Sequence, residues 1–186
     1  MKKLTQAFME TQWRLLVAMF LAQLLFLSAC ATAQPRVDHA FGFDTRLESP
    51  GVEVLDYQYG TSNQTGTRAP DWVVKEGRVS GGTNINGPML RGEYLRVKWR
   101  EKQSGEVREE TVDLRNRLPG NITDHRIHFV IRGTNLYVYA ISPEKVPGLC
   151  PADTRDAART GTPEDRIFRM YCDLKIIQIY PDQSKP

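Results

Sequence analysis

The 186-residue sequence has few of the residues that build catalytic and metal sites. It contains three histidines and no G-x-S-x-G motif, the turn that presents a nucleophilic serine in many hydrolases. His125 and His128 are three positions apart on an expected strand, so their rings face opposite sides and form a poor metal pair. We expect these two and His39 to be ordinary surface or half-buried residues. The sequence therefore favours a protein that is not an enzyme and needs no metal or cofactor.

A phosphate-binding loop is also lacking. The stretch "SGGTNING", residues 80–87, is rich in glycine, but no Lys-Ser/Thr pair and no helix pattern follow it. We interpret it as turn sequence.

Long apolar runs are absent except for one near the amino end. Leu15–Leu27 is an apolar block of 13 residues, interrupted only by Gln23. This length suits the core of a signal peptide and falls short of the ~20 residues that cross a bilayer as a helix. The block follows Lys2 and Lys3 and ends in Leu27-Ser28-Ala29-Cys30. That ending resembles the lipobox of bacterial lipoproteins at all four positions.

The lipobox resemblance implies cleavage before Cys30 and attachment of lipid to its thiol. Residues 1–29 are then a signal peptide, residues 30–40 a lipidated flexible tether, and residues 41–186 a single β-rich periplasmic domain. More than one acyl chain anchors a protein stably. Ala31, in place of an aspartate, favours the outer membrane facing the periplasm in proteins that resemble enterobacterial lipoproteins. An ordinary signal peptide or a single spanning helix is the alternative.

A strong charge of either sign is lacking as well. The chain has 25 basic and 22 acidic side chains. Loss of residues 1–29 removes three basic residues and one acidic residue, which leaves 22 against 21. Because nucleic-acid binding needs a concentrated basic surface, the near-neutral mature chain argues against a nucleic-acid partner.

Cysteine is scarce, and its count fits an exported protein. If Cys30 carries lipid, Cys150 and Cys172 remain as an even pair. In an oxidising compartment such a pair is expected to form a disulfide. No histidine lies near either cysteine in the sequence, which disfavours a metal site.

Alternating apolar residues predict strands in the mature chain. Arg91–Leu114 predicts a hairpin that buries Leu95, Val97 and Trp99. Residues 126–141 predict a second hairpin, apolar on both faces and therefore central. Further strands are expected at residues 51–59, 72–74 and 173–180, with short helical turns at 154–159 and 163–169. The expected fold is mainly β, an antiparallel β-sandwich or one curved sheet.

The strand expected at residues 51–59 has large apolar residues on both of its faces. Simple alternation places Leu55, Tyr57 and Tyr59 on one side, and Val52 and Val54 on the other. The stretch that follows, residues 60–70, has nothing large and apolar to bury and is expected to be a loop.

The succession of several motifs points to a family. They are "YQYG" (57–60), "RVSGGTNINGPMLRGEYLRVKWREK" (78–102), "ETVDLRNRLPGNI" (110–122) and "HFVIRGTNLYVYAISP" (128–143). This series resembles small β-rich lipoproteins found beside type VI secretion phospholipase effectors, where they serve as immunity proteins. The resemblance implies a membrane-anchored inhibitor that binds and blocks a cognate secreted phospholipase in the periplasm.

An inhibitor of this kind needs a complementary surface with aromatic and arginine anchors. The candidate partner-binding residues are Tyr57, Tyr59, Arg68, Trp72, Arg115 and Arg117. Two other classes remain open. One is a structural or assembly lipoprotein of a secretion or outer-membrane machine, and the other is a periplasmic enzyme or glycan-binding protein, which would need a pocket with convergent polar groups.

Overall fold

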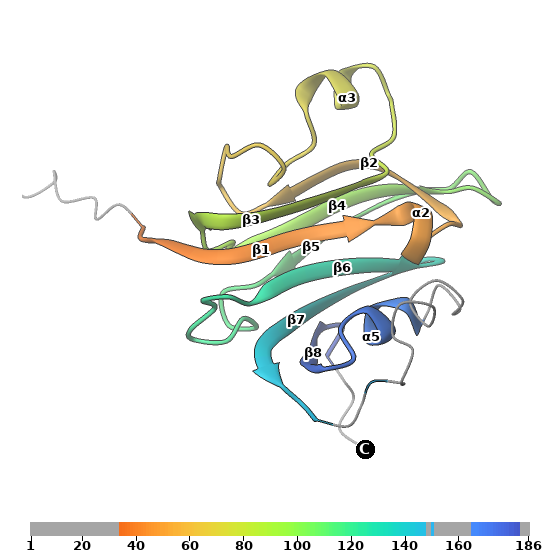
Figure 1. Ribbon diagram of the computed structural model, residues 1–186. Helices are drawn as coiled ribbons and strands as arrows, with labels where there is room; N and C mark the ends of the chain where they lie inside the picture. The colour runs from red at the N-terminus through yellow and green to blue at the C-terminus, as the bar shows by residue number, and fades with distance from the viewer. Residues whose placement is uncertain (1–33, 148–149, 151–164, 183–186) are drawn as a thin grey trace, which may run out of the picture. The chain divides into compact units, whose positions relative to one another are not determined.

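Two β-sheets pack face to face around one main core (Figure 1). The computed structural model describes residues 34–147, 150 and 165–182. Eight strands form the sheets: β1 (Arg36–Asp44), β2 (Val52–Tyr59), β3 (Gly82–Leu90), β4 (Tyr94–Glu101), β5 (Val107–Asp113), β6 (Arg126–Arg132), β7 (Asn135–Lys145) and β8 (Leu174–Tyr180). In these described ranges three short helices accompany them: α2 (Thr45–Glu48), α3 (Asp71–Lys75) and α5 (Arg166–Met170). The predicted mainly β fold is confirmed.

One sheet has five strands in the order β3-β1-β6-β7-β8, and the other has three in the order β2-β4-β5. All pairs are antiparallel except β1 with β6, which is parallel. The predicted hairpins are β4–β5 and β6–β7. The central position expected for the second hairpin is confirmed, because β6 and β7 each have a neighbour on both sides.

The inner faces of both sheets build the main core. Leu95, Val97 and Trp99 of β4 are buried, as the hairpin pattern predicts. From the larger sheet, Phe41 stacks on Tyr59 across the sandwich, with ring centroids 4.7 Å apart. Burial of these side chains, together with the aliphatic residues around them, stabilises the packing of the two sheets.

The first strand begins earlier than the sequence indicates. Residues 36–40, expected to be part of a flexible tether, lie in β1 between β3 and β6. The expected tether boundary at residue 40 is therefore wrong. His39 and Phe41 point inward and are buried, and they alternate with the more exposed Asp38 and Ala40. This alternation is a strand signal, but the proline at position 35 and the polar residues before it made the segment resemble a tether.

A bulge in β2 reverses the predicted faces. The pairing with β4 shifts between Val54 and Asp56, so Leu55 is the extra residue. Val52 and Val54 therefore share the buried face with Tyr57 and Tyr59. The sequence prediction, which placed Leu55 with the two tyrosines, is wrong because one inserted residue changes the parity of everything after it.

Two local assignments also differ. The glycine-rich stretch at 80–87, interpreted as turn sequence, mostly forms β3, which pairs with all nine residues of β1. Residues 72–74, expected to be a strand, lie in helix α3. Pro70 precedes that helix, where its fixed φ suits a helix start.

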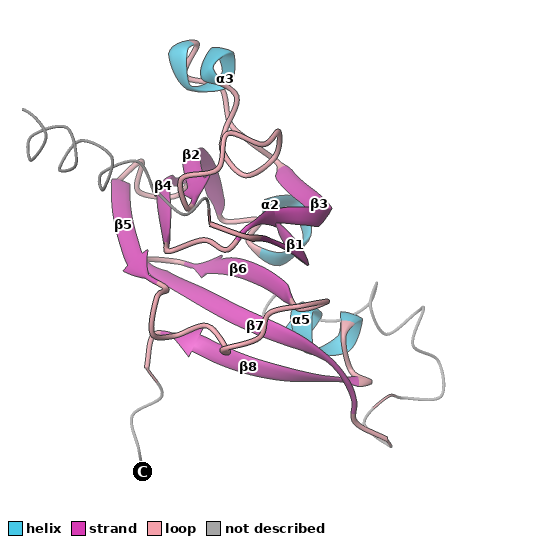
Figure 2. Ribbon diagram, turned by 90° about the vertical axis from the view of Figure 1, so that its left-hand side faces the viewer, coloured by secondary structure: helices cyan, strands magenta, loops and turns pink. Residues whose placement is uncertain are grey.

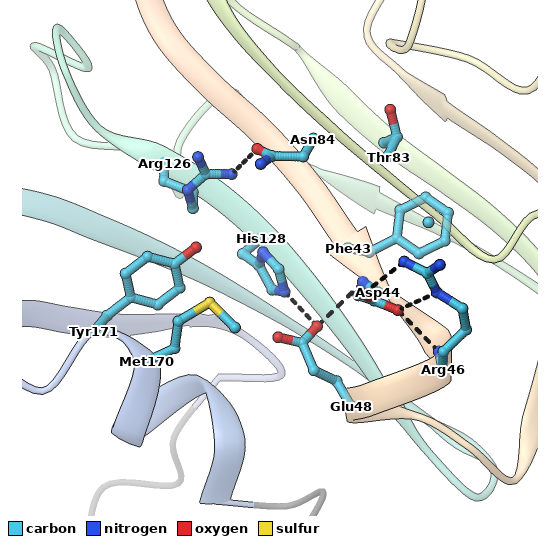
Figure 3. A pocket seen from close by; sticks show the side chains of 11 residues that line it. Phe43, Asp44, Arg46, Glu48, Thr83, Asn84, Arg126, His128, Met170 and Tyr171 are labelled. Carbon is cyan, nitrogen blue, oxygen red and sulfur yellow. Dashed lines mark hydrogen bonds and ion pairs between the residues drawn. The ribbon is translucent and has the colours of Figure 1, made fainter. Parts of the chain in front are cut away.

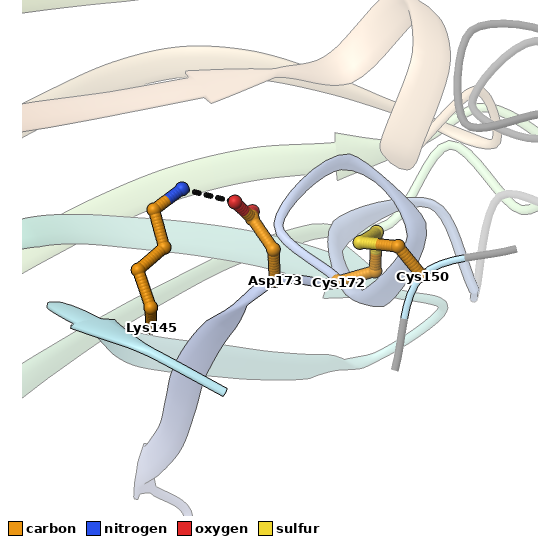
Figure 4. Close-up of a disulfide and its surroundings, with 4 residues drawn as sticks. All are labelled: Lys145, Cys150, Cys172 and Asp173. Atoms are coloured by element: carbon orange, nitrogen blue, oxygen red, sulfur yellow. Dashed lines mark hydrogen bonds and ion pairs between the residues drawn. A yellow bond between two sulfur atoms is a disulfide. The ribbon is translucent and has the colours of Figure 1, made fainter. Parts of the chain in front are cut away.

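Helix α5 lies beside the strands β7 and β8 of the five-stranded sheet (Figure 2). A second, smaller core lies between this helix and the outer face of the sheet. It joins Val130, Tyr139 and Ile141 of the sheet to Ile167 of the helix. The sulfur atoms of Cys150 and Cys172 are 2.02 Å apart, the distance of a disulfide bond (Figure 4). Cys172 lies two residues after α5, and Cys150 lies between β7 and α5 in the chain. The predicted pairing of the two cysteines is thus present in the structure.

Several predicted features lie outside the described residues. They are the signal peptide, the lipid-attachment residue Cys30 and the helical turn at residues 154–159. The turn expected at residues 163–169 overlaps α5 where the structure describes it.

Candidate functional site: the α3 protrusion

Two of the six predicted partner-binding residues are core residues. The side chains of Tyr57 and Tyr59 are 2% and 0% exposed. Tyr59 stacks on Phe41, and its hydroxyl hydrogen-bonds to Nε2 of His39 at 3.1 Å. Burial raises the pKa of the Tyr59 phenol to about 12. Their prediction as partner anchors is therefore wrong, because the bulge at Leu55 turns both rings inward.

The two predicted arginines after β5 have intramolecular partners. Arg115 binds the carboxylate of Asp113 through its Nε and Nη2, and this contact lowers the pKa of Asp113 to about 2. Arg117 pairs with Asp182, donates to the carbonyl oxygen of Ile179 at 3.0 Å and lies over the Tyr180 ring. Arg117 thus holds the end of β8 in place, whereas Arg115 remains at the surface.

Arg68 and Trp72, the other two candidates, lie together on a segment that projects from β2. We call residues 68–79, which include α3, the α3 protrusion. Figure 1 shows it standing away from both sheets. Trp72 is 54% exposed, and Val74 and Val79 are 43% and 46% exposed. Three of the large apolar residues exposed in the described part of the chain thus lie on this one segment.

Charged side chains surround these apolar residues. The Arg78 guanidinium lies 5.5 Å from the centroid of the Trp72 ring and also pairs with Glu76 at 2.8 Å. Arg68 pairs with Asp71. An exposed tryptophan with a stacked arginine and a charged margin has the composition of energetic centres in protein interfaces.

The α3 protrusion is tied to the sandwich at both of its ends. At its start, the amide of Ala69 donates to the carbonyl oxygen of Tyr57 at 2.9 Å. Just after its end, the amide of Ser80 donates to the carbonyl oxygen of Val54 at 2.8 Å. Val73, on the inner side of α3, is buried. These contacts hold the exposed tryptophan in a defined position, which reduces the entropy cost of binding.

A polar hollow of about 340 Å³ lies at the base of the α3 protrusion. Arg68, Val74 and Lys75 line it from the protrusion side. Asp56 and Arg96 line it from β2 and β4, and these two form an ion pair. A raised apolar tip beside a charged hollow offers both shape and charge to a partner protein.

The six sequence candidates do not form one surface. The sheet order β2-β4-β5 puts the α3 protrusion beyond one edge strand and residues 115–117 beyond the other. Only Arg68 and Trp72 are brought together. The strand-like pattern "DWVV" did not predict the projecting helix. It also did not predict that Val74 and Val79 are exposed on the same segment as the tryptophan.

Sequence reasoning missed a buried hydrogen-bonded pair of side chains on the other sheet. His128 of β6 donates from Nε2 to Oε2 of Glu48 at 2.6 Å, and the two side chains are 6% and 1% exposed (Figure 3). Glu48 sits in α2, for which no periodic signal exists in four residues. The expectation that the histidines are surface or half-buried residues holds for His125 and is wrong for His39 and His128.

Neither a metal cluster nor a membrane-spanning helix is present in the described ranges. Within residues 34–147, 150 and 165–182, no three His, Cys, Asp or Glu side chains gather to hold a metal ion. In the same ranges, no helix has the length and apolar character needed to cross a bilayer.

Comparison of the chain with protein-family models, curated proteins and solved structures finds no match.

Proposed function

We propose that this protein is a membrane-anchored immunity protein that binds and blocks a type VI secretion phospholipase effector in the periplasm. The α3 protrusion, with its exposed Trp72, is the observation that carries the proposal. The series of sequence motifs supplies the class of partner, and the lipobox supplies the anchor.

The shape of the α3 protrusion suits inhibition of an enzyme. Enzyme sites are concave and mostly apolar. A convex segment that carries Trp72, Val74 and Val79 can fill such a cleft, while the charges of Arg68 and Arg78 contact its margin. No catalytic group is needed, because occupation of the cleft is enough to exclude phospholipid.

The proposed location also fits the task. A lipid on Cys30 would hold the protein at the membrane that a phospholipase attacks, and tethering raises the effective concentration of an inhibitor there. The cysteine pair at 150 and 172 supports an oxidising compartment such as the periplasm.

The decisive experiment produces the cognate phospholipase effector of the proposal in the periplasm, with and without this protein. Cells that carry the protein should survive, cells without it should lyse, and the purified pair should bind in a fixed stoichiometry. Trp72→Ala should weaken binding at least about tenfold, because a central tryptophan typically contributes 2 kcal/mol or more to an interface.

Phe168→Ala is the matched control, since Phe168 is another exposed aromatic residue but lies on α5. Its affinity for the effector should equal that of the wild type. An absence of both rescue and binding would reject the immunity proposal. Envelope defects in a deletion strain that lacks the effector gene would instead favour the assembly role.

A further inference from the structure

A second hollow, separate from the α3 protrusion, lies on the outer face of the five-stranded sheet (Figure 3). Its volume is about 250 Å³. The floor is formed by Asn84 of β3 with Arg126 and His128 of β6, and the sides by Glu48 of α2 and by Met170 and Tyr171 at the end of α5. We call it the Glu48–His128 pocket.

Arg126 is the guanidinium in this pocket that has no carboxylate partner among the described residues. The other arginine of the lining, Arg46, is bound by Asp44 through two hydrogen bonds of 3.0 Å. Arg126 instead donates to the Asn84 side-chain oxygen at 2.8 Å and lies 5.8 Å from the centroid of the Tyr171 ring. Neutral neighbours on both sides hold the guanidinium in place without cancelling its charge.

The backbone leaves room for Arg126 to cross β1. A Cβ atom at Gly42 would lie 3.2 Å from Nη1 of Arg126 and 2.7 Å from the carbonyl oxygen of Thr83. Any larger residue at position 42 would therefore displace the guanidinium from its path between β6 and β3. A positioned, unneutralised guanidinium is the usual binding group for a carboxylate or phosphate.

The buried pair at the other side of the pocket has hydrogen-bonding capacity left over. Oε1 of Glu48 and Nδ1 of His128 are buried and have no hydrogen-bond partner in the described structure. A carboxylate oxygen accepts only, so the group that completes Glu48 must be a donor such as a hydroxyl. Buried polar atoms are nearly always paired, so two unpaired atoms beside one hollow point to an occupant.

Taken together, the geometry points to a small hydroxylated carboxylate, of the sugar-acid class, as the ligand of the Glu48–His128 pocket. Its carboxylate pairs with Arg126, and a hydroxyl donates to Glu48 and reaches His128. The apolar parts of Tyr171 and Met170 contact its carbon atoms. The volume lies below the ~300–1,000 Å³ typical of pockets for drug-sized ligands, so the ligand is the size of a single sugar ring.

Glucuronate is the probe for a calorimetric titration of the full-length protein. Glucose, acetate and inorganic phosphate are the comparison arms, because each lacks either the carboxylate or the hydroxyl groups. Saturable binding of glucuronate, with each of the other three at least about tenfold weaker, is the expected result. Equal binding by acetate overturns the hydroxyl part of the inference, equal binding by phosphate overturns the carboxylate part, and equal binding by glucose overturns the anionic part.

Two variants then locate the site. Arg126→Gln should weaken glucuronate binding at least about tenfold, since a hydrogen-bonded charge pair is lost. Arg132→Gln is the matched control, because Arg132 lies on the same strand, over the Tyr137 ring, and outside this pocket. An unchanged affinity in Arg126→Gln overturns the assignment.

A measurement on the unaltered chain covers the case in which Arg126→Gln fails to fold. Glucuronate should shift the imidazole NMR signals of His128 and leave those of His125 in place. A glucuronate-terminated oligosaccharide tells a free sugar acid from a polysaccharide end, and binding of either supports the inference. No shift at His128 overturns it. None of these results depends on the phospholipase effector, so this inference and the proposed function fail separately.

Discussion

The two faces of the five-stranded sheet are covered in different ways. The inner face packs against a whole second sheet and buries Phe41, Phe129 and Ile131 in a core shared by both sheets. The outer face is covered over β6 and β7 by α5, a helix of five residues. A second sheet holds its position through many contacts, whereas so short a helix needs other constraints. The cysteine pair beside α5 supplies one.

The largest effect is expected in the shared core. Phe41→Ala removes a ring that stacks on Tyr59 across the sandwich and should lower the free energy of unfolding by about 3–5 kcal/mol. Urea denaturation followed by tryptophan fluorescence measures the loss. A cost no larger than that of Val107→Ala, which removes an exposed side chain, would contradict a shared core.

Removal of the cysteine pair tests whether it holds α5 against the outer face of the five-stranded sheet. In Cys150→Ser/Cys172→Ser, the free energy of unfolding should fall by about 3 kcal/mol, because a closed loop with a sequence separation of 22 is released in the unfolded chain. Hydrogen exchange should rise first at Ile167 and along β8, with Val97 and Trp99 protected as before. Uniform loss of protection across both sheets would show that the two regions are not distinct.

Alkaline pH tests the depth of burial in the shared core. The pKa of Tyr59, raised by burial to about 12, exceeds the ~10 of a phenol in an unfolded chain. Stability contributed by this group is complete below about pH 10 and is lost as the pH rises toward about 12, because only the unfolded chain gives up the proton in that window. In Tyr59→Phe, the fall in unfolding free energy between about pH 9 and about pH 11 should be shallower than in the wild type. Equal slopes would contradict the burial argument.

The smallest effect is expected on the outer face of the three-stranded sheet. Arg96 pairs there with Asp56 and with Glu109 on the strands at either side. Arg96→Ala should cost about 1 kcal/mol, since partly exposed ion pairs contribute little. Arg100→Ala, which breaks a single and more exposed pair with Glu53 on the same face, should cost less. Thermal denaturation at low and at high salt separates the two, because salt weakens the exposed pair more.

Local sequence patterns were enough to predict strands whose two faces differ. Leu95, Val97 and Trp99 alternate with charged residues, and the β4–β5 hairpin follows from that pattern alone. The mixed sheet could not be predicted from local sequence patterns, because the parallel pairing of β1 with β6 joins segments that are more than 80 residues apart. Asn84 and Asn86 of β3 carry no β signal of their own and become a strand only because β1 lies beside them.

The two candidate sites differ in the same way, because local sequence predicts residues of one and not of the other. Trp72 and Arg68 could be chosen from sequence, because an aromatic residue and an arginine in a loop are common interface anchors. The pairing of Glu48 with His128 spans 80 residues and depends on how a four-residue helix meets β6. No local spacing encodes that contact.

The strand that follows residue 35 has a mechanical consequence. A pulling force applied to the chain before β1 enters the fold through a strand that is hydrogen-bonded on both sides, with nine residue pairs to β3 alone. Those bonds lie across the direction of pull and share the load at once instead of opening one after another. The domain is therefore expected to resist unfolding by a force applied at its amino end.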